Sequence, residues 1–246
     1  MERAYAEYAA HQAAELLAID SPTGFTAKAA EWVKAQFEAL GYTASITEKG
    51  GVLIELDGEN AADALLLEAH TDTLGGMVAE IKSNGRLRLT NLGGLCAANC
   101  ETENARLYTR GGAVIEGTLQ LCNASIHVNG DFADTKRSFD TTELVLDEDV
   151  KSAEDTRALG VEVGDFVCFD PRTRITKSGY IKSRFLDDKL SVGILLGLAK
   201  YMKDTGAKPE RRVYAHITVY EEVGHGGAGS VPTGVTCLLY TSPSPR

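Results

Sequence analysis

The sequence predicts an α/β fold that is interrupted by a β-barrel-like or sandwich insertion. Helical spacing of apolar residues marks residues 1–39, short alternating strands fill residues 76–178, and a strongly apolar helix returns after Asp187. Because helices and strands stand on both sides of a stretch without helical periodicity, we expect one α/β domain that is split by a separate β domain.

The segment before the insertion supplies two helices and the first strands. Residues 1–18 show a broken apolar stripe, and a second helix is expected over residues 26–39, with Thr26 as its N-cap and Gly41 just beyond its end. Strands are expected at residues 42–48, 51–56 and 64–69. The last of these is an apolar run bounded by turns, which is typical of a strand buried on both faces, and it ends at His70.

Within the insertion, short strand-like pieces alternate with turns rich in Gly, Asn, Asp and Thr. Asn84-Gly85 lies between two alternating runs, which is a strong hairpin signal, and a short helix is expected at residues 154–159. The predicted division of the chain is an α/β domain at residues 1–75 and 179–236, a β-rich domain at residues 76–178, and a tail at residues 237–246.

After Asp187 an apolar helix is expected to run to the Asp204-Thr205-Gly206 segment. A strand at residues 212–220 follows, with apolar residues at alternate positions, and it ends at Glu221-Glu222. This helix and strand return the chain to the α/β domain.

The composition excludes several kinds of partner. The chain has 246 residues, 43% of them hydrophobic, and a formal net charge of −10. An acidic surface repels phosphate backbones, which argues against nucleic acid. No run of about 18 apolar residues exists to span a membrane, and the charged N-terminus differs from a signal peptide. The 5 cysteines fit thiols in a reducing compartment, so we expect a cytoplasmic protein.

Chemically active residues gather at three places where strands or loops are expected to end, and the first is His70-Thr71-Asp72. An imidazole that leaves an apolar strand can bind a metal. A carboxylate two residues later lies on the same side of an extended chain, where it can hold the other ring nitrogen. A buried structural histidine with a nearby aspartate explains the same pattern, so this motif alone leaves both interpretations open.

The other two places carry paired carboxylates. Asp187-Asp188 precedes a helix, where acidic residues often cap the N-terminus, but Asp187 can also bridge two metal ions with Asp188 supporting it. Glu221-Glu222 ends an apolar strand, where two carboxylates carry a desolvation cost unless a cation neutralises them. A solvated loop is the alternative. His225 is either a substrate-pocket residue or an ordinary loop histidine.

The combination of these residues is more informative than each alone. A histidine, an aspartate and a glutamate supply nitrogen and oxygen ligands that suit zinc or cobalt. A second glutamate beside the liganding one can act as general base on a water held by the metals. The sequence therefore favours a hydrolytic metal centre.

Three segments of the chain resemble, in order and context, the motifs of the tetrahedral aminopeptidase family, which includes glutamyl and deblocking aminopeptidases. The segments are Ala69-His70-Thr71-Asp72, Phe185-Leu186-Asp187-Asp188-Lys189 and Glu221-Glu222-Val223-Gly224. The resemblance covers nearly the whole chain up to Thr236. It implies a mixed-sheet, aminopeptidase-like metallopeptidase domain with a second domain inserted between the first two motifs.

The resemblance also implies roles for individual residues. His70 would bind one of two divalent ions, zinc or cobalt, Asp187 would bridge both ions, and Glu222 would bind the other. Glu221 would be the general base, and Asp72 would orient His70. The resemblance further implies removal of N-terminal residues from peptide substrates and assembly into homo-oligomers through the inserted domain.

The match stops near the end of the chain. The family has an aspartate ligand on the next strand and a histidine ligand far downstream, and neither stands in this sequence. Residues 237–246, which end in a Pro- and Ser-rich stretch, match nothing expected, and we interpret them as a non-native tail on an incomplete gene. We therefore expect the polypeptide as written to be unstable and poorly active.

Other functions remain open at this point. A related two-metal deacylase or carboxypeptidase would use the same ligands on other substrates, and a non-catalytic assembly protein would retain the fold without turnover. A polysaccharide hydrolase needs two carboxylates that flank a sugar without holding metal, and the His70 cluster gives no reason for that chemistry.

Overall fold

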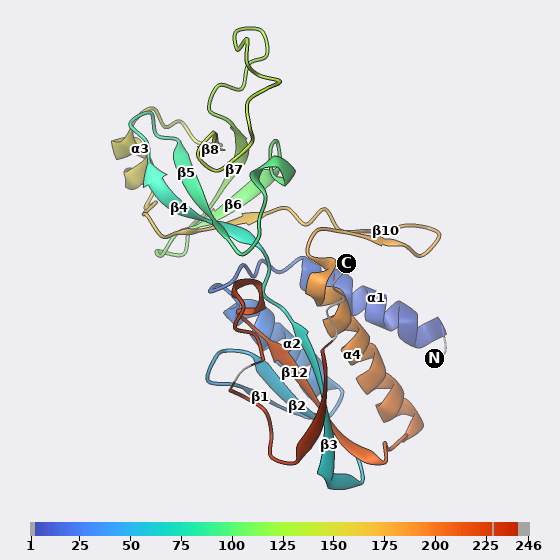
Figure 1. Cartoon of the computed structure of the whole chain (residues 1–246). Coiled ribbons are helices and arrows are strands. Elements are labelled where there is room, and N and C mark those ends of the chain that lie inside the picture. The colour runs from blue at the N-terminus through green and yellow to red at the C-terminus, as the bar shows by residue number, and fades with distance from the viewer. Residues whose placement is uncertain (1–2, 228, 241–246) are drawn as a thin grey trace. The chain divides into compact units, whose positions relative to one another are not determined.

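The computed structural model describes residues 3–227 and 229–240 and divides into two compact units, which are drawn in Figure 1. Unit 1 consists of residues 1–73 and 171–246, and unit 2 of residues 74–170. Unit 1 holds helices and a mixed sheet, and unit 2 holds a closed barrel. The predicted fold class, an α/β domain with a mixed sheet and a β-barrel-like insertion, is confirmed.

The sheet of unit 1 is built from strands that come from both ends of the chain. They are β1 (Thr43–Ile46), β2 (Val52–Asp57), β3 (Asn60–His70), β12 (Arg211–Thr218) and β13 (Val235–Tyr240). Among the described residues the order is β1-β2-β12-β3-β13. β12 runs antiparallel to β2 and parallel to β3, and β13 runs parallel to β3 on its other side, which makes the sheet mixed.

Strand β13 includes the first four residues of the predicted non-native tail. Cys237–Tyr240 pair in parallel with Leu65–Glu68 of β3. Residues 241–246 lie outside the part of the chain that the structure describes. The interpretation of residues 237–246 as a non-native tail stays a prediction.

Three helices, α1 (Arg3–Leu17), α2 (Ala27–Ala39) and α4 (Leu186–Thr205), pack against one face of this sheet. The core between them is apolar and uses alternate residues of β2, β3 and β12: Val52, Ile54, Leu56, Leu67, Ala69, Val213, Ala215 and Ile217, with Leu16, Val33, Phe37, Val192 and Leu196 from the helices. Because side chains alternate along a strand, Glu68, His70, His216 and Thr218 point to the opposite face. This second face carries the polar groups described below.

The ends of the helices lie close to the predicted positions, with one difference at Thr26. Thr26 occupies the N-cap position of α2, but its side chain makes no capping hydrogen bond. Its backbone carbonyl instead accepts from the Ala30 N–H at 3.0 Å. Gly41 follows α2 with φ 87°, and Gly206 ends α4 with φ 67°, both in the left-handed region that glycine tolerates.

Unit 2 is a barrel closed in the order β4-β5-β8-β7-β6-β9. Its strands are β4 (Gly75–Ile81), β5 (Leu87–Leu92), β6 (Asn104–Tyr108), β7 (Val114–Leu121), β8 (Thr142–Leu146) and β9 (Phe166–Phe169). The predicted hairpin at Asn84-Gly85 joins β4 to β5, with Gly85 at φ 82°. The unit also has a 3-10 turn η1 (Ala97–Asn99) and the short helix α3 (Ala153–Ala158), which Ser152 caps.

The boundaries between the units fall at 73/74 and 170/171, whereas the sequence placed them at 75/76 and 178/179. The larger shift has a local cause. Strands β10 (Arg174–Ile175) and β11 (Ile181–Lys182) form a small antiparallel hairpin, so residues that precede Ser178 fold back on those that follow it. In the described part of the chain, no helix combines the length and the apolar character that crossing a membrane requires.

Helices α1 and α4 approach each other closely at glycine positions. A β-carbon added at Gly193 would lie 2.6 Å from the Ala9 carbonyl oxygen and 2.7 Å from the Ala13 β-carbon. One added at Gly197 would lie 2.9 Å from the Ala9 β-carbon. Small residues on both helices therefore set the position of α4, and α4 carries Asp187 and Asp188 at its start.

We expect Gly193→Val to lower the free energy of unfolding by roughly 1–3 kcal/mol, because the added side chain has to separate two packed helices. Urea denaturation would measure it. Ile194→Val is the matched control, since Ile194 is the next residue of α4 and 49% exposed. A Gly193→Val protein as stable as the parent would contradict this account of the packing.

Candidate metal centre

The three predicted clusters lie at one edge of the unit 1 sheet. β3 ends at His70 and β12 ends at Thr218, and these two residues are register partners in adjacent parallel strands. Glu221–Val223 form the 3-10 turn η2 directly after β12. The carboxyl ends of neighbouring parallel strands create the usual position for a ligand site in an α/β sheet.

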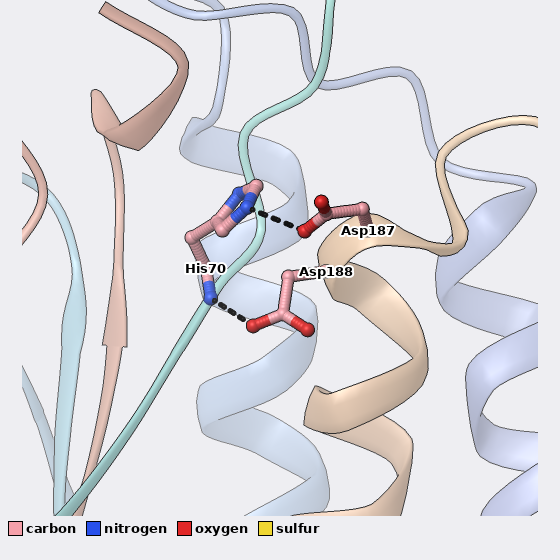
Figure 2. A group of neighbouring side chains, drawn as sticks. All are labelled: His70, Asp187 and Asp188. Atoms are coloured by element: carbon pink, nitrogen blue, oxygen red, sulfur yellow. Dashed lines mark hydrogen bonds and ion pairs between the residues drawn. The ribbon is translucent and has the colours of Figure 1, made fainter. Parts of the chain in front are cut away.

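His70 and the start of α4 face each other in Figure 2. The His70 Nε2 lies 3.2 Å from Asp187 Oδ1 and 3.5 Å from Glu221 Oε2. The His70 backbone N–H donates to Asp188 Oδ2 at 3.3 Å. Among the described residues, His70, Asp187 and Asp188 form a group whose ligand atoms all lie within 4.8 Å of one another. This spacing fits one metal ion.

Asp187 and Asp188 lie at the first turn of α4 without helical geometry. Both have non-helical backbone angles, and the peptide bond between them is cis. Asp188 is buried, whereas 60% of the Asp187 side chain is accessible. Their carboxylates turn toward His70 (Figure 2), which goes beyond the simple helix-capping interpretation of this pair.

The other ring nitrogen of His70 defines its tautomer. Nδ1 lies 2.9 Å from the Asp72 carbonyl oxygen and 3.4 Å from Asp72 Oδ1. A carbonyl oxygen only accepts hydrogen bonds, so Nδ1 carries the proton in the neutral ring. The Nε2 lone pair of this tautomer then points toward Asp187 and Glu221, which is the arrangement that a metal-binding histidine requires.

The Asp72 carboxylate is fully buried and joins several parts of the site. It accepts from Thr23 Oγ1 at 2.7 Å, from the Glu221 N–H at 3.2 Å and from the Glu222 N–H at 3.3 Å. Burial raises the pKa of Asp72, but hydrogen bonds from His70 and Thr23 outweigh this and hold the pKa below its usual value. Asp72 therefore fastens the turn with both glutamates to the end of β3.

The charges around His70 fit a cation. Burial lowers the pKa of His70, yet the hydrogen bond to Asp72 and the negative charges of Asp72, Asp188 and Glu221 raise it to about 9. Burial raises the pKa of Glu222 to about 7; His70 opposes this rise, and the charges of Asp72, Glu221 and Asp187 add to it. Several carboxylates thus crowd one imidazole, and a divalent cation would allow all of them to ionise.

The remaining predicted residues lie at different distances from this group. Glu222 is half-buried in η2 and stands outside the group of three donors, so its role as a ligand stays a prediction. His225 is exposed in the following loop. Its backbone carbonyl accepts from Lys49 Nζ, and its N–H donates to the Tyr220 carbonyl at 2.9 Å.

The structure also identifies supporting residues that the sequence analysis missed. Thr23 binds Asp72, and Ser21 Oγ donates to the Thr71 carbonyl at 2.7 Å. The buried Lys189 Nζ donates to the carbonyls of Leu16 at 3.1 Å and Ile19 at 2.6 Å. The sequence marked residues 19–24 only as a turn, and no local pattern indicated that their side chains reach His70-Thr71-Asp72.

We expect Thr23→Val to destabilise the metal-free protein by about 1–3 kcal/mol at neutral pH, because a buried carboxylate loses a hydroxyl donor. The pKa of Asp72 is lower in the folded state than in the unfolded chain, where it is about 3.9. Ionised Asp72 therefore stabilises the fold at pH values above the unfolded-state pKa, and this stabilisation is lost as the pH falls through the folded-state pKa. The difference between variant and parent, measured by urea denaturation, should therefore shrink at acidic pH. Thr23→Ser keeps the hydroxyl and is the control; an equal loss in both variants would contradict the hydrogen-bond explanation.

Comparison with known proteins places this chain in a family. The family model described as M42 glutamyl aminopeptidase matches residues 50–240. The chain is 38% identical over 218 residues to YhfE of Bacillus subtilis (strain 168), a protein assigned to the aminopeptidases by its name; the match covers 89% of this chain and 63% of YhfE. It is 25% identical over 218 residues to a glutamyl aminopeptidase of Lactococcus lactis, covering 87% of this chain and 59% of that protein.

Solved structures agree on the fold. A Pyrococcus horikoshii TET1 peptidase, which can assemble into a tetrahedron or a large octahedral shell, superposes with a TM-score of 0.73 at 23% sequence identity, over 88% of this chain and 62% of that one. The chain thus spans about 60% of the length of the relatives that it matches. The resemblance drawn from the three sequence motifs is confirmed, and the chain belongs to the M42 glutamyl aminopeptidase family.

Proposed function

We propose that the protein is a metal-dependent aminopeptidase that removes N-terminal residues from peptides. The observation that carries the proposal is the convergence of three elements on one point: the His70 Nε2 lies 3.2 Å from Asp187 Oδ1 and 3.5 Å from Glu221 Oε2. These side chains come from the end of β3, the start of α4 and the turn η2. The names of its relatives, glutamyl and lysyl aminopeptidases, support this choice of reaction.

The donor set suits two divalent ions, zinc or cobalt. His70 would hold one ion through Nε2, Asp187 would bridge both, and Glu222 would hold the other. When bound, such ions supply Lewis acidity that activates a water and polarises the scissile carbonyl. Asp188 accepts a hydrogen bond from the His70 backbone N–H and would help to hold the ligand His70 in position.

Glu221 is the proposed general base. Its carboxylate lies on the Nε2 side of His70, where it would take a proton from the attacking water and pass it to the leaving amine. The neighbouring Asp72 holds the backbone N–H groups of Glu221 and Glu222, and so it keeps base and ligand in their relative positions. Asp72 also orients His70 through Nδ1.

The two adjacent glutamates offer a sharp test because they differ in their proposed roles. We expect Glu221→Gln to lower turnover of free-amino peptides by roughly 10²–10⁴-fold while bound metal stays at the parental level. Glu222→Gln should lose both turnover and bound metal. Kinetics on a peptide panel and metal analysis by mass spectrometry would measure these effects, and chelation should abolish the parental activity.

The same panel separates the alternatives. A deacylase would prefer N-acylated over free-amino peptides, and a carboxypeptidase would release residues from the other end. A non-catalytic assembly protein would show no turnover and no difference between Glu221→Gln and the parent. Each of these results would reject the aminopeptidase proposal.

We further propose that the protein is cytoplasmic and forms homo-oligomers through the barrel of unit 2. The TET1 peptidase of Pyrococcus horikoshii assembles into closed shells, and unit 2 of this chain exposes apolar side chains. Ile126 is 64% exposed and Val128 is 78% exposed in the segment between β7 and β8. Contiguous patches of exposed apolar side chains are typical of interaction surfaces, and these two residues are only two positions apart.

We expect Ile126→Ser combined with Val128→Ser to reduce the assembled mass, because two apolar contacts would be lost from the barrel surface. Light scattering coupled to size exclusion would measure the mass. Ile175→Ser in unit 1 is the control, since Ile175 is 48% exposed and apolar. A control that dissociates while the double variant stays assembled would place the interface in unit 1.

A further inference from the structure

A buried acid–base pair lies beside the candidate metal centre without belonging to its donor group. Glu68 on β3 and His216 on β12 are register partners in adjacent parallel strands. The His216 Nδ1 lies 2.8 Å from Glu68 Oε1, and each residue is only 2% exposed. Both side chains are on the same face as His70, which follows Glu68 by two positions.

The stability of the fold alone does not explain why a carboxylate and an imidazole are buried here. Removing a carboxylate and an imidazole from water carries a desolvation cost that their attraction often fails to recover. The neighbouring positions of β3 and β12 on the other face are apolar, and two apolar side chains would fill this position as well. The contacts of the polar atoms of Glu68 and His216 therefore indicate the role of the pair.

The Glu68 carboxylate supports the loop that follows the two glutamates. A β-carbon added at Gly227 would lie 2.5 Å from Glu68 Oε2 and 2.6 Å from Oε1. One added at Gly226 would lie 3.3 Å from both Cβ and Cγ of Glu221. The Gly226-Gly227 turn is thus packed between the carboxylate of Glu68 and the side chain of Glu221.

We propose that Glu68 and His216 are positioning residues that seat the Gly226-Gly227 turn and thereby fix the Glu221 side chain relative to His70. His216 forms a hydrogen bond with one carboxylate oxygen of Glu68, and Gly227 packs against both oxygens. The expected effect on turnover rests on the proposed aminopeptidase function. The packing also predicts an effect on metal affinity, because Glu222 is next to Glu221.

The test is a double-mutant cycle between Gly227 and Glu68. Gly227→Ala introduces a methyl group against the carboxylate, and Glu68→Ala removes the support. We expect each change to weaken zinc affinity, measured by competition with a chromophoric chelator, by about 10-fold or more, and to lower kcat by a similar factor. In the double variant the methyl group has space, so the two losses should not multiply.

Glu68→Gln keeps the size and the contact with His216, and we expect it to retain more zinc affinity and kcat than Glu68→Ala. If Glu68→Ala does not fold, the cycle is run with Gly227→Ala and Glu68→Asp, whose side chain is shorter by one methylene and also leaves space for the methyl group. Losses that multiply, or single variants that lower only the melting temperature, would overturn the positioning role. An inactive parent that still shows the coupled zinc effect would reject the peptidase proposal and leave the positioning role standing.

Discussion

The candidate metal centre of unit 1 depends on a concentration of negative charge at one end of two parallel strands. His70, at the end of β3, has carboxylates on the Nε2 side from Asp187 and Glu221, and its backbone N–H donates to Asp188. A protein without a cation at this point has to keep one or more of these groups protonated, as the raised pKa values of His70 and Glu222 indicate. A bound divalent ion removes that conflict, which is why the arrangement suits a metal centre.

The ligands come from distant segments, and buried polar contacts hold these segments together. Asp72 connects Thr23 with the turn that carries both glutamates. Lys189 connects the end of α1 with the start of α4 through the carbonyls of Leu16 and Ile19. Each contact satisfies a polar group that would otherwise be buried at a cost, so the same hydrogen bonds that stabilise the fold also orient the donors.

The glycines have two separate uses in this fold. Gly193 and Gly197 let α4 approach α1, which places Asp187 and Asp188 beside His70. Gly226 and Gly227 let a loop pass between Glu221 and the buried carboxylate of Glu68. In both cases the absence of a β-carbon lets two segments of backbone and side chain pack closer than a larger residue would allow. This close packing sets the positions of Asp187 and Asp188 in the first case and of Glu221 in the second.

The sequence by itself determined the fold class, the presence of a β-rich insertion and the three motifs of the M42 family. These features are local: apolar periodicity identifies a strand or helix, and a carboxylate that follows an apolar strand is recognisable in a short window. For the same reason the sequence singled out His70, Asp187 and Glu221, whose side chains lie close together in the structure. It marked residues 19–24 only as a turn and assigned residues 171–178 to the insertion.

Only the tertiary structure decided which distant residues meet. His216 and Glu68 are 148 positions apart and pair because β12 lies parallel to β3 in one particular register. Thr23 reaches Asp72 from a segment 49 positions away, and Lys189 reaches Leu16 across 173 positions. Periodicity carries no information on strand order or register, since either can change without altering the pattern of any single element, and these contacts follow from both.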